Sequence, residues 1–144
     1  MSELQYGFAW DDSFALGHEQ VDMQHQQLFS LVNDLVGSCM RGDNTVDIQK
    51  TLFFLVDYAV RHFKDEEALL VQCGFPDYKR HKQLHENFKV IVSKLVERFI
   101  QNASQAELIS DINKIVVRWL VDHIHHEDKK IGEYLRSTTN TIRS

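Results

Sequence analysis

The stretch His62-Phe63-Lys64-Asp65-Glu66 places a histidine and a glutamate four residues apart. On an α-helix, positions four apart lie on the same face, one turn above the other. An imidazole beside a carboxylate is the pair of ligand types that a transition metal takes from a single helix. Because many surface helices carry one such pair by chance, the pair has to be judged by its surroundings.

The residues around this pair form an apolar seam, which is a row of mainly apolar positions that follow one another at intervals of three or four residues along one face of the helix. Such spacing is typical of the core-facing side of a helix in a bundle. His62 and Glu66 therefore occupy positions where the pattern calls for leucine. A buried carboxylate without a partner is strongly unfavourable or changes its protonation state, so other helices must supply partners. The seam reads Ile48, Leu52, Leu55, Ala59, His62, Glu66 and Leu69.

Length and composition are those of one ordinary globular domain. The chain has 144 residues, of which 43% are hydrophobic and 26% are charged. This is enough for a hydrophobic core without disulfide staples. A single proline and six glycines favour long helices. The net charge of −5 predicts no contact with nucleic acid. No apolar run reaches the roughly 18 residues of a membrane span, so no membrane insertion is expected.

The cysteines and the N-terminus predict a cytoplasmic location. Cys39 and Cys73 match neither a metal-binding spacing nor a disulfide framework. Residues 1–10 contain no basic segment followed by an apolar one, so we expect no signal peptide.

Two helices are predicted in the first half of the chain. Asp22 is a suitable N-cap for the first helix, and Asn44 or Thr45 can cap the second. The second helix is expected to end near Val71, because Gly74 suits the left-handed position that follows a helix. The seam of the first helix reads His25, Leu28, Val32, Leu35 and Cys39.

Two more helices are predicted in the second half. Pro76 suits the start of the third helix, which is followed by a short connection at residues 101–103. Ser104 with Glu107 three residues later forms a capping-box pattern for the fourth helix. The two seams read His81, His85, Phe88, Val92, Leu95 and Phe99, and Leu108, Ile112, Val116, Trp119 and His123.

Four helices with short connections predict an all-α fold, an antiparallel up-down-up-down four-helix bundle. The bundle is expected to comprise residues 20–136. Residues 1–19 are expected to form an N-terminal arm packed across it, and residues 137–144 a frayed C-terminal tail. The aromatic residues of the arm are Phe8, Trp10 and Phe14.

This topology brings the seam histidines together. In an antiparallel bundle, the starts of the first and third helices lie at the same end as the ends of the second and fourth. Taken singly, each histidine is more often structural than a ligand. Together with Glu66 at one level of the interior, they would be strongly destabilising if unpaired, and a metal site removes that penalty. They are His25, His62, His81, His85 and His123.

Other titratable side chains near this level are expected to face solvent. His18 precedes the first helix and is a surface group or a neighbour of the ligands. His125 and His126 fall off the seam, and Asp65 and Glu67 should point outward.

The end of the fourth helix leaves the choice of a second carboxylate open. Glu127 lies four residues after His123, the ideal step along one face. Asp128 lies five residues after it, about 140° away on a regular helix. Spacing alone therefore favours Glu127, unless a local widening of the helix brings Asp128 to the same face.

Together these motifs resemble the hemerythrin family, and most of all its single-domain bacterial members, over about residues 8–135. The combination is highly specific. The matching motifs are Asp22-x-x-His25, His62-Phe63-x-x-Glu66, His81-x-x-x-His85 and Trp119-Leu120-Val121-Asp122-His123-Ile124-x-x-x-Asp128.

The resemblance implies a centre of two non-haem iron ions that binds O₂ reversibly. It implies that one iron is held by three histidines and the other by two, with two carboxylates and an oxo or hydroxo group bridging them. The count of donors leaves one position open for O₂, on the iron with two histidines. The implied ligands are His81, His85 and His123 for one iron, His25 and His62 for the other, and Glu66 and Asp128 as bridges. The implied O₂ pocket consists of Leu28, Phe29, Phe63, Trp119, Leu120 and Ile124.

Three functions are compatible with such a centre. The first is a non-enzymatic O₂ carrier or store that delivers O₂ to an oxidase or monooxygenase. The second is an O₂- or redox-sensing domain, since related domains occur fused to signalling modules. The third is a di-iron enzyme acting on peroxide or nitric oxide. The bundle uses nearly the whole chain, which favours the carrier unless the sequence is a piece of a longer protein.

Overall fold

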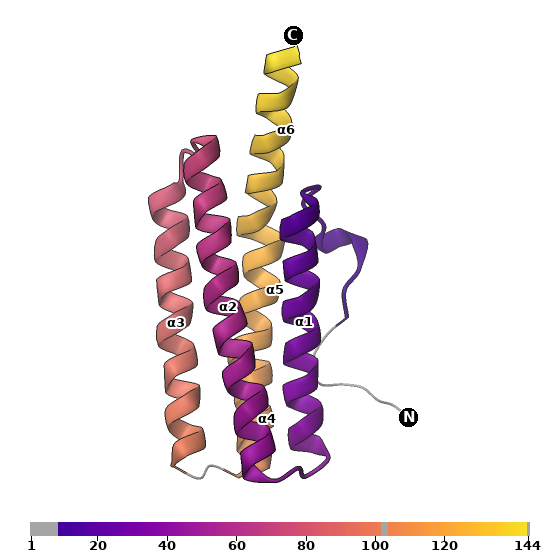
Figure 1. The fold of residues 1–144 in the computed structure, drawn as a ribbon, viewed down its shortest axis with the longest axis vertical. Helices are drawn as coiled ribbons and strands as arrows, with labels where there is room; N and C mark the ends of the chain where they lie inside the picture. Colours follow the sequence, from indigo (N-terminus) through magenta and orange to yellow (C-terminus); the bar gives the residue numbers. More distant parts are fainter. Residues whose placement is uncertain (1–8, 102–103, 144) are drawn as a thin grey trace.

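Four antiparallel helices form the structure (Figure 1), and most of the seam residues are buried between them, so the predicted bundle is confirmed. The computed structural model describes residues 9–101 and 104–143. A short 3₁₀ helix, η1 (Asp12–Phe14), precedes α1 (Glu19–Met40), α2 (Thr45–Cys73) and α3 (Tyr78–Ile100). The fourth helix is continuous and consists of α4 (Gln105–Asp111), η2 (Ile112–Val117), α5 (Arg118–Asp122), η3 (His123–Asp128) and α6 (Lys129–Arg143). Both η2 and η3 are π-helical.

Side-chain caps explain several of the helix ends. The side chain of Asn44 accepts a hydrogen bond from the backbone N–H of Asp47, which makes Asn44 the N-cap of α2. Gly74 ends α2 in the left-handed conformation with φ of 70°. Ser104 and Glu107 form the expected capping box of α4. Caps of this kind typically stabilise a helix by about 1 kcal/mol.

The start of α1 differs from the prediction, because His18 and not Asp22 is the N-cap. The ring nitrogen Nδ1 of His18 accepts the backbone N–H of Val21 at 3.3 Å. Asp22 lies in the first turn of the helix, and its carboxylate accepts the backbone N–H groups of Leu16 and Gly17. Asp22 therefore fastens the preceding arm to the helix instead of capping it.

Two other boundaries also differ from the prediction. Pro76 lies in the turn before α3, which begins at Tyr78. The last helix continues to Arg143, so residues 137–143 are helical and do not form a frayed tail. In Figure 1 this helix extends beyond the end of the bundle at which α2 ends and α3 begins.

None of the helices in the described part of the chain is long and apolar enough to cross a membrane.

The interior contains two large apolar clusters, one at each side of the level where the seam histidines lie. The larger cluster fills the half of the bundle toward the α1–α2 turn and includes Leu28, Leu52, Phe63, Phe88, Leu95 and Leu120. The smaller one consists of Leu16, Val21, Leu70, Phe75 and Ile131.

The described part of the arm packs against α1 and the fourth helix. Phe14 is buried in a third cluster with Phe29 and Ile124, against which Trp10 packs. The ring centroids of Phe14 and Phe29 are 4.8 Å apart in an edge-to-face arrangement. Phe8, the remaining aromatic residue expected in the arm, lies outside the described residues.

A glycine in α6 sets the distance between the arm and the bundle. A Cβ atom added to Gly132 would lie close against the backbone oxygen of Leu16 and 3.2 Å from its carbonyl carbon. Arg136 also donates a hydrogen bond to that oxygen. Since backbone atoms cannot move aside as a flexible side chain does, we expect Gly132→Ala to destabilise the protein by about 1–3 kcal/mol. Urea unfolding measures this change.

Gly37 in α1 provides the matched control. A Cβ atom there would meet only the end of the flexible Arg41 side chain, at 3.1 Å. We expect Gly37→Ala to be neutral or to stabilise by up to about 1 kcal/mol, since alanine is the better helix former. Equal stability of the two variants would show that the contact at Gly132 is unimportant.

Candidate metal centre

Two buried carboxylates, from Glu66 and Asp128, lie at the centre of the histidine level, each 1% exposed. The two oxygens of Glu66 face different histidines. Oε1 lies 2.8 Å from Nε2 of His81 and 3.1 Å from Nε2 of His85. Oε2 lies 3.3 Å from Nε2 of His25 and 3.2 Å from Nε2 of His62.

Asp128 divides its contacts in the same way. Its Oδ1 lies 3.0 Å from Nε2 of His81 and 3.1 Å from Nε2 of His123. Its Oδ2 lies 3.1 Å from Nε2 of His25. The two carboxylates thus separate the histidines into two groups and offer one oxygen to each group. The larger group is His81, His85 and His123, and the smaller is His25 and His62.

A π-helical turn brings Asp128 into this cluster. The segment His123–Asp128 is π-helical, so its backbone hydrogen bonds span five residues and each turn is wider than in an α-helix. His123 and Asp128 therefore share a face, and this is the local widening that Asp128 requires.

Glu127 lies outside the cluster and pairs with Arg80 of α3. Arg80 donates hydrogen bonds to both carboxylate oxygens of Glu127, at 2.5 and 3.0 Å. These hydrogen bonds, which outweigh the effect of partial burial, lower the pKa of Glu127 to about 2. The choice that regular spacing favoured is thus contradicted by the structure: Glu127 connects helices at the outside of the bundle.

The cluster contains many buried polar atoms without hydrogen-bond partners. Among the described residues, every buried side-chain nitrogen or oxygen atom that lacks a partner belongs to it. A cation accepts lone pairs from several directions at once, so it satisfies atoms that cannot form hydrogen bonds with one another. A mixed set of imidazoles and carboxylates suits iron and other first-row transition metals. The atoms are Nδ1 and Nε2 of His25, Oε2 of Glu66, Nε2 of His85, Nε2 of His123 and Oδ1 of Asp128.

Electrostatics inside the cluster are dominated by the two carboxylates. Burial alone would lower the pKa of His25 and His81, but the adjacent Asp128 and Glu66 outweigh it and raise the two pKa values to about 9 and about 10. Burial would raise the pKa of Glu66, but the four surrounding histidines hold it well below its ordinary value. A metal cation would therefore replace protons on the imidazoles when it binds.

Two of the histidines are fixed from outside the cluster by side chains that the sequence did not reveal. The Nδ1 atom of His62 lies 2.8 Å from Oε1 of Gln24, whose amide nitrogen donates to the exposed Asp65. The Nδ1 atom of His85 lies 2.7 Å from Oε2 of Glu67, which was expected to point outward and does not. Such contacts fix the ring orientation of metal-binding histidines. The only sequence signal was that Gln24 and Glu67 are neighbours of residues in the cluster.

The other histidines have separate roles. His18 caps α1, as described above, and His126 is exposed as expected. His125 was expected to be solvated, but its ring stacks on Phe14 at 4.1 Å and lies within hydrogen-bond distance of Ser13. It therefore contributes to the attachment of the arm.

Aromatic rings hold the inner histidines on the side of the larger apolar cluster. Phe63 stacks on His85 with ring centroids 4.1 Å apart, and Trp119 stacks on His123 at 4.3 Å. Of the residues expected to form an O₂ pocket, Phe29 and Ile124 lie on the other side, beneath the arm.

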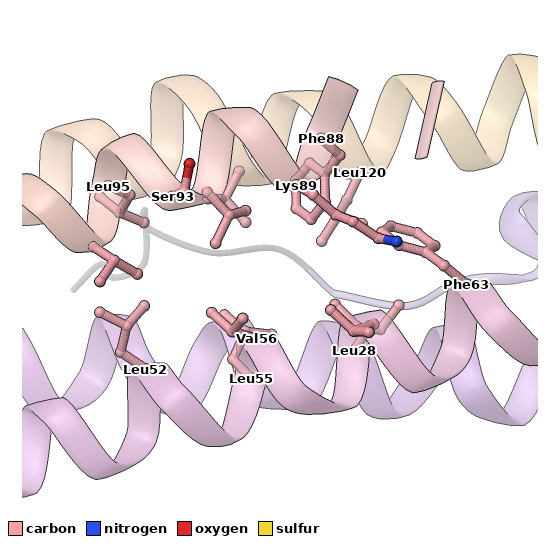
Figure 2. Close-up of a pocket in the computed structure, with 15 residues that line it drawn as sticks. Leu28, Leu52, Leu55, Val56, Phe63, Phe88, Lys89, Ser93, Leu95 and Leu120 are labelled. Carbon is pink, nitrogen blue, oxygen red and sulfur yellow. The ribbon is translucent and has the colours of Figure 1, made fainter. Parts of the chain in front are cut away.

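A cavity of about 270 Å³ begins beside these rings and extends between α2 and α3 (Figure 2). Leu28, Phe63 and Leu120 line its end near the cluster. The expected pocket residues are thus divided between two apolar regions and not gathered in one.

Comparison with known proteins agrees with this geometry. Residues 16–135 match the family model described as hemerythrin HHE cation binding domain. A bacteriohemerythrin from Methylococcus capsulatus is 37% identical over 114 residues, which cover 79% of this chain and 85% of the relative. A hemerythrin-like protein from Naegleria gruberi is 32% identical over 124 residues, which cover 85% of this chain and 89% of that protein.

Solved structures show the same fold. A crystal structure of wild-type hemerythrin has a TM-score of 0.78 and 32% identity, and covers 89% of this chain and 97% of its own. The crystal structure of a leucine-to-alanine mutant of hemerythrin has a TM-score of 0.79 and 30% identity, with 91% and 98% coverage. The helices, the buried cluster and these relationships lead to one conclusion: this chain belongs to the hemerythrin family.

Proposed function

We propose that this protein binds O₂ reversibly at a centre of two non-haem iron ions and acts as a carrier or store, not as an enzyme. The observation that supports this most directly is the division of the ligand atoms by Glu66 and Asp128, each of which offers one oxygen to each group of histidines. When bound, a pair of ferrous ions supplies the electrons and the open coordination position that reversible O₂ binding requires. One iron would be held by His81, His85 and His123, the other by His25 and His62, and the two carboxylates would bridge them.

The surrounding residues would keep the site rigid and dry. Gln24 and Glu67 orient the rings of His62 and His85 through their Nδ1 atoms. Phe63 and Leu120 form an apolar wall beside the cluster, both 2% exposed. Exclusion of water protects a bound ligand from proton transfer and displacement.

The lining of the adjoining cavity favours a binding role over a catalytic one. Its lining residues include no histidine and no carboxylate, so it offers no acid–base pair to a second substrate. We propose that the O₂ is passed to an oxidase or monooxygenase, and that the protein works in the cytoplasm. Its two free thiols, Cys39 and Cys73, support a reducing compartment.

The decisive experiment is metal analysis combined with a visible spectrum. We expect two irons per chain, because the cluster holds two groups of donors that share Glu66, and Asp128 also contacts a histidine of each group. The reduced protein should gain visible absorption in air and lose it again when O₂ is removed. One metal per chain, zinc as the native metal, or a spectrum that air does not change would refute the proposed function.

A further inference from the structure

The cavity between α2 and α3 is longer and larger than a diatomic gas requires. It reaches from Phe63, at the end near the metal cluster, to Leu52 and Leu95 deep in the bundle (Figure 2). The eleven steps from Leu52 to Phe63 along α2 correspond to about 16 Å at 1.5 Å per residue. A volume of about 270 Å³ spread over this length describes a narrow channel, whose shape fits a linear chain better than a ring.

The wall of this channel is almost entirely aliphatic and aromatic. Ser93 is one of its two polar residues, and its hydroxyl donates a hydrogen bond to the backbone oxygen of Val90 at 2.8 Å. Ser93 lies at the solvent-exposed edge of the channel, so its hydroxyl does not make the interior polar. Apolar cavities of this size stay dry and bind apolar molecules. The apolar lining includes Leu52, Leu55, Val56, Ala59, Val92 and Val96.

Lys89, the other polar residue of the lining, places a positive charge at the end of the channel near Phe63. Lys89 lines the channel, and Figure 2 shows its side chain extending in the direction of the end at which Phe63 lies. The ammonium pairs with Glu86 at 2.9 Å, in a contact that is exposed on both sides. Exposed pairs of this kind add little stability, so a ligand anion can compete for Lys89.

Glu86 would keep an oppositely charged neighbour if Lys89 released it to bind a ligand anion. Lys82 lies four residues before Glu86 on α3, so the two oppositely charged side chains share one face of the helix. Lys82 would therefore still attract Glu86 if Lys89 turned to a ligand.

We propose that this channel binds a linear aliphatic carboxylate, such as a medium-chain fatty acid. The chain would lie between α2 and α3 with its methyl end toward Leu52 and Leu95. Its carboxylate would meet the ammonium group of Lys89 at the opposite end. The shape of the channel selects a linear chain, its dry wall selects methylene groups, and Lys89 selects an anion over a neutral alcohol.

Titration calorimetry of the full chain with dodecanoate, below its micelle concentration, tests this site. We expect one dodecanoate per chain, and butyrate should bind at least about 100-fold more weakly because it buries fewer methylene groups. Decan-1-ol serves as the neutral ligand. The measurement needs no iron, so its failure would leave the proposed O₂ function unaffected.

Two pairs of variants locate the ligand. Lys89→Met should weaken dodecanoate binding about tenfold through loss of a charged hydrogen bond, with decan-1-ol unaffected. Lys94→Met, which removes an exposed lysine of the same helix outside the channel, should leave both unchanged. Ala59→Leu and Val56→Phe fill the channel and should each abolish binding of both ligands, with circular dichroism confirming the fold.

Three results would overturn the proposal. The first is the absence of saturable dodecanoate binding to the parent protein. The second is binding that survives in a folded Ala59→Leu or Val56→Phe variant, since the ligand would then lie on the surface. The third is an equal loss of dodecanoate affinity in Lys89→Met and Lys94→Met, which would show that the carboxylate of the ligand does not lie at Lys89.

Discussion

Replacement of Asp128 by alanine is expected to abolish the paired metal site, whereas replacement of Glu127 should leave it nearly intact. Asp128 is buried and offers one oxygen to each group of histidines. Without it, Glu66 is the remaining carboxylate in the cluster, so a second cation loses both a ligand and a compensating charge. We expect iron content to fall from two per chain to one or none, and the absorption gained in air to disappear.

Glu127→Ala is the matched control, because it removes the neighbouring carboxylate of the same helix. It breaks a partly exposed pair with Arg80, and the loss of such a pair changes stability by about 0–1 kcal/mol. Asp128→Asn keeps the size of the side chain and should also lose the paired site, which separates loss of ligation from a folding defect. Iron content, the air-dependent spectrum and circular dichroism are measured on each variant. Two irons retained in Asp128→Ala, or their loss in Glu127→Ala, would contradict the assignment.

The first three helices could be predicted from the sequence because each is a regular α-helix. In such a helix the seam positions recur at three and four residues, so burial follows directly from the spacing of apolar residues. His25, His62, Glu66, His81 and His85 all obey this rule and are all buried. Antiparallel topology then places them at one level without any further information.

The fourth helix could not be predicted in the same way, because its period changes along its length. Two π-helical segments interrupt it, and each shifts the inward-facing side by part of a turn. Regular spacing accordingly favoured Glu127, and the pattern of the hemerythrin family was needed to indicate Asp128. After the first π segment, Leu120 is fully buried while Trp119 is only partly buried and stacks on His123.

Contacts between elements explain most of the remaining differences. Glu67 and His125 were expected to face solvent because each lies off the seam of its own helix. Glu67 nevertheless meets His85 of α3, and His125 is covered by Phe14 of the arm. Helix periodicity describes one helix at a time, so it cannot show which side chain of another element lies across from an off-seam position.

Leu120→Ala is expected to lower stability and also shorten the lifetime of the oxygenated protein. Leu120 is 2% exposed and lines the channel beside Phe63, one turn before His123. Removal of a buried leucine side chain costs about 2–5 kcal/mol when the site cannot collapse. The space it leaves adjoins the metal cluster, so water can approach the bound ligand more closely. We therefore expect the absorption gained in air to decay faster, with both irons retained.

Leu52→Ala separates these two effects. Leu52 is also a buried leucine of the same channel, 1% exposed, but it lies at the opposite end. Its replacement should cause a comparable loss of stability in urea unfolding, because the same atoms are removed from the same apolar cluster. The decay of the absorption in air should, however, stay at the parent rate, because the new space is far from the metal ligands. If the absorption gained in air decays at the same rate in Leu120→Ala and Leu52→Ala, Leu120 stabilises the core and does not protect bound O₂.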